Sequence, residues 1–140
     1  MSVLKLKYKI EGDDFTRAGE ASSEVKRKLK QIGYNPDAIR RLSIAMYEGE
    51  INMVIHANGG EAFVDIYPDK IDVILKDTGP GIEDIEKAMQ EGYSTAPDNV
   101  RSLGFGAGMG LPNIKKYTDE MKIDSKVGKG TTMFFSVYVH

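Results

Sequence analysis

The first predicted element is a β-strand. In LKLKYKI, residues 4–10, every second residue is apolar and the residues between them are lysines. This period of two is typical of a strand with one buried face. A stripe at helical spacing follows: Ala18, Ser22, Val25 and Leu29. It predicts a helix for which Asp14 is the expected N-cap and which ends near Gly33.

A second helix is indicated by the segment NPDAIRR. Asn35 is a good N-cap, Pro36 suits the first helical position, and Asp37 lies at the positive end of the helix dipole. An apolar stripe continues from there: Ile39, Leu42, Ala45 and Met46. We expect this helix to run to about residue 57, where NGG stops it, with Met46 and Met53 as ordinary core residues.

Four further runs predict two β-hairpins. EAFVDIY and KIDVILKD, residues 61–67 and 70–77, are separated by a Pro-Asp pair. Near the carboxyl end, EMKIDSKV and TTMFFSVYV flank the turn GKG at residues 128–130. A short helix is predicted before this second hairpin, from roughly Leu111 to Tyr117.

A long connection separates the two hairpins. From Thr78 to Leu103 it holds turn residues and one short helical piece near residues 82–91, so we expect a mobile lid over approximately residues 83–107. The predicted order is strand, helix, helix, strand, strand, lid, helix, strand, strand. Strands gathered in hairpins with helices apart from them predict one α+β domain over residues 1–140, a two-layer α/β sandwich.

Composition excludes several classes of function. The sequence has no cysteine and two histidines, so any metal must be held by oxygen or amide ligands. The net charge is -2 and the basic residues are spread along the chain, which argues against nucleic acid as a partner. No window approaches the roughly 20 apolar residues of a membrane span, and the amino terminus does not resemble a signal peptide. We therefore expect a cytoplasmic protein that does not insert into membranes.

Glu48 and Asn52 form the first candidate site. They are four residues apart on the predicted helix and share one face, whereas Glu50 lies about 200° from Glu48 and should point elsewhere. A carboxylate and an amide oxygen together suit Mg²⁺, and a carboxylate beside that ion could orient or deprotonate a nucleophile. The alternative is a solvated polar patch, which is preferred for this pair taken alone.

Three glycine-containing segments are further candidates. In DTGPGI, residues 77–82, Asp77 could accept a hydrogen bond from an exocyclic amine while the glycines admit a flat ring. Alternate glycines in residues 104–110 run into the amino end of a predicted helix, which is a site for anions such as phosphate. GKGTT, residues 128–132, connects two predicted strands. Taken singly, the first and third are preferred as plain turns, and phosphate binding is preferred for the second.

In this order, the four segments resemble the N, G1, G2 and G3 boxes of the GHKL ATPase superfamily. The chain is most similar to the small bacterial serine/threonine protein kinases of that superfamily, the anti-sigma factors and switch kinases, over essentially its whole length. The resemblance implies a Bergerat-type ATP-binding fold, with a mostly antiparallel mixed sheet and helices on one face. It also implies protein kinase activity with ATP and Mg²⁺ as cofactors.

The resemblance implies a role for each matching residue. Glu48 would be the general base on the attacking hydroxyl, Asn52 would hold Mg²⁺, and Asp77 would accept from the adenine amino group. The remaining nucleotide-binding residues would surround the base (Gly79, Gly81 and Thr131) or the phosphates (Arg101, Gly106, Gly108 and Gly110).

Partners are implied by the same resemblance. The substrate would be a small STAS-domain antagonist of the anti-anti-sigma type, phosphorylated on Ser or Thr, and a sigma factor would be a second partner. Relatives of the anti-sigma type form homodimers, and the first strand could pair across a two-fold axis. The alternative function is a non-catalytic, ATP-dependent module that sequesters a sigma factor or another regulator. The catalytic domain of a histidine kinase is not expected, because no helix with a phosphoacceptor histidine precedes residue 1.

A few positions depart from the family pattern. Gly49 stands inside a predicted helix where alanine is more usual, which weakens the helix by roughly 1 kcal/mol. Ala96 occupies a lid position where relatives often have a basic residue, and Gly104 and Gly106 lengthen the glycine loop. These departures affect the expected rate of phosphoryl transfer and the branch of the family more than the identity of the bound nucleotide.

Overall fold

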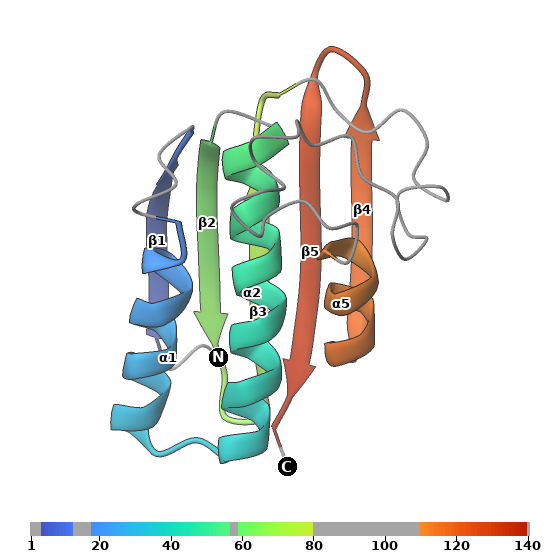
Figure 1. The fold of residues 1–140 in the computed structure, drawn as a ribbon. Helices are drawn as coiled ribbons and strands as arrows, with labels where there is room; N and C mark the ends of the chain where they lie inside the picture. The colour runs from blue at the N-terminus through green and yellow to red at the C-terminus, as the bar shows by residue number, and fades with distance from the viewer. Residues whose placement is uncertain (1–3, 13–17, 57–58, 80–109, 140) are drawn as a thin grey trace.

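An antiparallel five-stranded sheet carries helices on one face (Figure 1). The computed structural model describes residues 4–12, 18–56, 59–79 and 110–139. The elements in these residues are β1 (Leu4–Glu11), α1 (Glu20–Ile32), α2 (Pro36–His56), β2 (Gly59–Ile66), β3 (Lys70–Lys76), α5 (Gly110–Tyr117), β4 (Glu120–Lys126) and β5 (Gly130–Tyr138). The predicted α+β two-layer sandwich is confirmed.

The strand order in the sheet is β1-β2-β3-β5-β4. Every pairing between the described strands is antiparallel, so this part of the sheet is more uniform than the mixed sheet that the resemblance implied. Both predicted hairpins are present. The Tyr67 amide donates to the Lys70 carbonyl at 2.9 Å in the first turn, and the Lys129 amide donates to the Lys126 carbonyl at 2.9 Å in the second.

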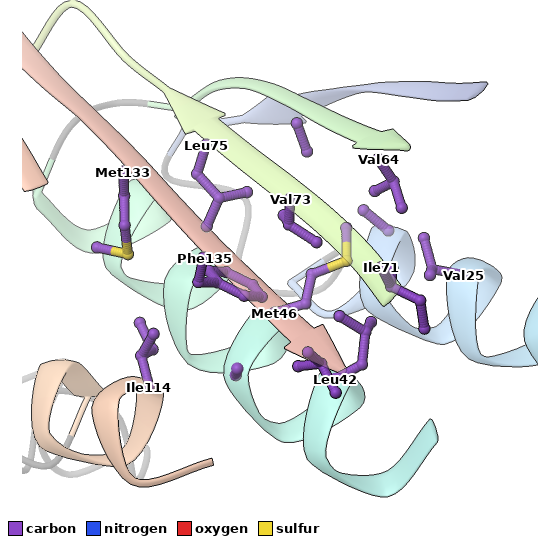
Figure 2. Packing of buried hydrophobic residues seen from close by; sticks show 14 of the residues in the cluster. Val25, Leu42, Met46, Val64, Ile71, Val73, Leu75, Ile114, Met133 and Phe135 are labelled. Atoms are coloured by element: carbon purple, nitrogen blue, oxygen red, sulfur yellow. The ribbon is translucent and has the colours of Figure 1, made fainter. Parts of the chain in front are cut away.

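The core lies between the sheet and its helical layer. Figure 2 shows side chains from α1, α2, α5 and the inner face of the sheet packed together, among them Val25, Leu42, Ile114 and Phe135, all 0% exposed. Each such residue stabilises the fold by about 1.5–3 kcal/mol relative to an exposed position. Met46 and Met53 belong to the same cluster, which confirms their expected role as core residues. None of the helices in the described ranges is long and apolar enough to cross a membrane.

Helix α2 begins as its local sequence predicts. Asn35 Oδ1 accepts hydrogen bonds from the backbone amides of Asp37 at 2.8 Å and Ala38 at 3.4 Å. These bonds satisfy amides that have no partner within the helix. The end of α1 is likewise as predicted, because Gly33 has a φ of 94° and its amide donates to the Leu29 carbonyl.

The start of α1 differs from the prediction. Asp14 was the expected N-cap, but the helix begins at Glu20 and its N-cap is Gly19, with a φ of 95° and no side-chain capping bond of its own. The carboxylate of Glu50 on α2 accepts from the first amides of α1 instead. Local sequence could not show this, because the capping group lies about thirty residues further along the chain.

Candidate functional site

The segments that carry the candidate residues meet at one end of the sheet. The second half of α2, the end of β3 and the start of β5 lie there together (Figure 1), and α5 contacts α2 through Asn113 and Glu48. A Cβ placed on Gly60 would lie 2.5 Å from Met53 Cε and 3.1 Å from Asp77 Cα, so the last turns of α2 lie beside the end of β3. Antiparallel pairing of β3 with β5 brings the start of β5 to the same place.

Glu48 and Asn52 lie on α2, and both side chains are half-buried. Glu48 Oε1 accepts from Asn113 Nδ2 of α5 at 3.4 Å, which is long for a hydrogen bond. Among the residues that the structure describes, the carboxylate therefore keeps most of its capacity to accept. Asn113 was not singled out from the sequence, although it lies three residues after Gly110, the last glycine of the run. Its position shows that α5 borders the same site as α2.

Glu50 points away from Glu48, as the helical period predicted. Its side chain is 2% exposed and lies against the start of α1. Between the two carboxylates, Gly49 packs on β3. A Cβ there would lie 2.2 Å from Leu75 Cδ1, so an alanine would require the Leu75 side chain to move. The glycine that departs from the family pattern thus allows close approach of α2 to the sheet.

Asp77 joins the end of β3 to the start of β5. Its Oδ1 accepts from the amide of Gly79 at 2.9 Å and from the amide of Thr131 at 3.2 Å, and its own amide donates to the Thr131 carbonyl at 2.9 Å. These two accepted bonds, made within the described residues, use one carboxylate oxygen. Oδ2 is thereby left to accept a hydrogen bond from a bound group.

Thr131 is 9% exposed and anchors the other side of this junction. Its hydroxyl lies 2.7 Å from the hydroxyl of Ser125 on β4, so the two share a hydrogen bond. Ser125 was missed in the sequence. The period of two along β4, which places Met121 and Ile123 on the inner face, would have placed it there too. Gly130 is required here, because its φ is 119° and a Cβ would lie 2.3 Å from the Asp77 carbonyl oxygen.

Several predicted residues lie outside the described residues: Gly81, Ala96, Arg101, Gly104, Gly106 and Gly108. The same holds for the predicted lid and its short helix. Gly110 is described and is the first residue of α5, so the glycine run leads into a helix as expected. The phosphate-binding role of these glycines stays a prediction.

The donor set at α2 fits a weakly held, hard cation. The described residues contain no cluster of three or more metal-binding His, Asp or Glu side chains. One carboxylate and one amide oxygen on a half-buried helix face match the few protein ligands that Mg²⁺ takes when phosphates supply the others.

Comparison with known sequences identifies the family. A family model described as "Histidine kinase-like ATPase domain" matches residues 13–136. The chain belongs to this family. The histidine kinase-like ATPase domain found here is of the GHKL type, which confirms the superfamily expected from the four boxes.

Relatives of this ATPase domain include named bacterial regulators. "Serine/threonine-protein kinase RsbT" of Bacillus subtilis is 32% identical over 106 residues, covering 73% of this chain and 74% of the relative. "Anti-sigma F factor" of Clostridium acetobutylicum is 34% identical over 135 residues, covering 91% and 86%. "Anti-sigma F factor" of Caldanaerobacter subterraneus is 30% identical over 144 aligned positions, covering 99% and 94%.

A solved structure supports the ATPase fold independently of close sequence similarity. The "Mycobacterial sensor histidine kinase MprB" aligns with a TM-score of 0.55 at 17% identity, covering 98% of this chain and 99% of that one. At this identity the likeness shows the fold alone.

Proposed function

We propose that the protein is an ATP- and Mg²⁺-dependent serine/threonine protein kinase that acts as a partner-switching regulator, either an anti-sigma factor or a switch kinase. The observation that carries the proposal is that Glu48 and Asn52 share one face of α2, whose last turns lie beside the end of β3, where Asp77 bonds with Thr131. The family supports ATP as the ligand, and the names of the relatives support a regulator that acts on proteins.

The junction between β3 and β5 would bind the base. Asp77 Oδ1 is occupied by two backbone amides, so the carboxylate has a fixed orientation and Oδ2 can accept from the adenine amino group. The Thr131 hydroxyl, held by Ser125, would border the ring. A base that presents a carbonyl in place of the amine would oppose the carboxylate oxygen, so ATP is favoured over GTP.

The α2 face would serve the chemical step. Asn52 would hold Mg²⁺, which when bound neutralises phosphate charge and orients the terminal phosphate. Glu48 would take the proton from the partner's Ser or Thr hydroxyl as the hydroxyl oxygen bonds to the γ-phosphorus. The bond from that phosphorus to the β–γ bridging oxygen breaks, and ADP leaves. The amino end of α5 offers backbone amides to the phosphates.

The proposed substrate is a small STAS-domain antagonist, with a sigma factor as a second partner. The test is phosphoryl transfer from ATP to purified antagonists from the same organism, followed by phosphoprotein mass spectrometry. We expect Mg²⁺-dependent phosphorylation by the wild type and a loss of about 100-fold or more in Glu48→Ala, since a general base contributes about 10²–10⁴-fold. Equal rates for the two proteins would refute the role of Glu48.

A second candidate is the non-catalytic binding module. Its support is the printed name of two relatives, "Anti-sigma F factor", which states an action against a sigma factor and no transfer reaction. The same assay separates the two functions. Tight ATP binding without any ADP or phosphoprotein in the presence of partners would favour sequestration over catalysis.

A further inference from the structure

The amino end of α1 is held by a buried carboxylate from another helix. Glu50 Oε2 accepts from the amides of Gly19 at 2.9 Å and Ala21 at 3.2 Å, and Oε1 accepts from the amide of Ser22 at 3.0 Å. Hydrogen bonds from amides to a charged acceptor are stronger than neutral ones, and a negative charge at a helix amino end is favoured by the dipole. This contact therefore fixes Glu50 firmly.

A second contact on the same face of α2 reinforces the first. A Cβ on Gly19 would lie 2.9 Å from Tyr47 Cε1, so the Tyr47 ring packs directly on the glycine backbone. Tyr47 and Glu50 are three residues apart and therefore share one helix face. Together they attach the start of α1 to a single turn of α2.

That turn also carries the proposed general base. Glu48 lies about 200° from Glu50 around the helix, and within the described residues its contact with α5 is the long 3.4 Å bond from Asn113. The direction of Glu48 is thus governed by the rotation of α2 about its axis. Two contacts restrict that rotation: the hydrogen bonds of Glu50 to the start of α1, and the close packing of Gly49 on Leu75.

We propose that Glu50 is a positioning residue for phosphoryl transfer, an inference that rests on the proposed function. It sets the rotation of α2, so that Glu48 faces the end of the sheet where Asp77 lies, and it couples the start of α1 to the site. Binding of the base depends on Asp77 and Thr131, which belong to the sheet. Loss of the Glu50 contact should therefore slow transfer without weakening ATP binding to the same degree.

The test compares Glu50→Gln with two controls in the transfer assay. Glutamine keeps the shape but turns an N–H₂ group toward the backbone amides, so at least one bond is lost. Val25→Ala is the stability control, because Val25 is a fully buried residue of α1 whose side chain takes no part in the cap, and Glu61→Gln is the charge control on the sheet surface. Amide hydrogen exchange at Gly19, Ala21 and Ser22 reports the cap itself.

We expect Glu50→Gln to lower kcat about tenfold or more while the KM for ATP changes less than about twofold, since a displacement of about 1 Å can cost up to about 100-fold. Exchange at the three amides should accelerate. Each protein is assayed at the same number of degrees below its own Tm. Under this condition Val25→Ala should keep kcat within about twofold of the wild type. Should Glu50→Gln fail to fold, Glu50→Asp decides, because it keeps the charge on a shorter arm and should show the same split.

Two outcomes have different meanings. A wild type without any transfer overturns the proposed function and this inference with it. A wild type that transfers phosphate while the Glu50 variant keeps its kcat, or while Val25→Ala loses as much, overturns the positioning role alone.

Discussion

Replacing Gly130 with alanine tests the junction that joins β3 to β5 beneath the proposed base site. Gly130 has a φ of 119°, and a Cβ on it would lie 2.3 Å from the Asp77 carbonyl oxygen and 2.8 Å from Thr78 Cα. Both neighbours are backbone atoms, so a side-chain rotation cannot relieve the clash. The two strand ends must separate, and the hydrogen bonds between Asp77 and Thr131 must lengthen or break.

The same hairpin provides a matched control. Gly128 has a φ of 80°, but a Cβ placed on it would meet no described atom within 4 Å, so Gly128→Ala adds backbone strain without a clash. A left-handed conformation costs an alanine roughly 1–2 kcal/mol. Gly130→Ala adds the loss of a backbone hydrogen bond, about 0.5–1.5 kcal/mol, and of a bond to a carboxylate, about 1.5–3 kcal/mol. We therefore expect Gly130→Ala to be less stable than Gly128→Ala by about 2–4.5 kcal/mol.

Thermal unfolding and ATP titration of both variants are the measurements. For a domain of this size, about 3 °C in Tm corresponds to 1 kcal/mol, so the two variants should differ by about 6–14 °C. ATP affinity should fall in Gly130→Ala and stay near the wild-type value in Gly128→Ala. Equal melting temperatures for the two variants would refute the reasoning, because the clash with Asp77 is the feature that separates them.

Two further predictions concern α2. Gly49→Ala should lower the free energy of unfolding despite a gain of about 1 kcal/mol in helix propensity, because the added Cβ meets Leu75. Leu75→Val should relieve that clash, so a double-mutant cycle measured by urea unfolding should show coupling between the two positions. Additive effects of the two mutations would contradict the contact. The pKa of Asp37 lies below its usual range because Arg40 and Arg41 donate hydrogen bonds to it. The ionised Asp37 side chain contributes to stability above its pKa in the unfolded chain, and this contribution is lost as the pH falls through its lower pKa in the folded protein. Asp37→Asn should therefore flatten the acid side of a plot of Tm against pH. An unchanged plot would contradict this role of Asp37.

Local patterns were sufficient for most of the fold. The alternation in β1 and the capping signals of α2 depend on neighbouring residues, and both elements form where the sequence predicts them. The start of α1 could not be predicted in this way. Its cap is Glu50, which belongs to another helix and becomes a partner only when the two helices pack.

The candidate site was predictable to a similar extent. The shared face of Glu48 and Asn52 follows from the helical period, and so does the opposite direction of Glu50. The bond between Asp77 and Thr131 depends on the pairing of β3 with β5, which no local pattern specifies. The expected role of Asp77 and Thr131 in binding the base came from the resemblance to a family. Asn113 and Ser125 were missed for the same reason, because each gains its role from a residue on another element.

Binding of ATP at Asp77 is the central claim, and calorimetric titration of the wild type and Asp77→Asn with ATP, in the presence and absence of Mg²⁺, tests it most directly. Asparagine can keep an oxygen for the amides of Gly79 and Thr131, but it then presents an N–H₂ group where Oδ2 stood. We predict saturable ATP binding by the wild type that Mg²⁺ strengthens, and an affinity about tenfold to 100-fold lower in Asp77→Asn, since an unpaired buried polar group costs about 1–3 kcal/mol. Absence of ATP binding by the wild type, or equal affinities for the two proteins, would contradict the account.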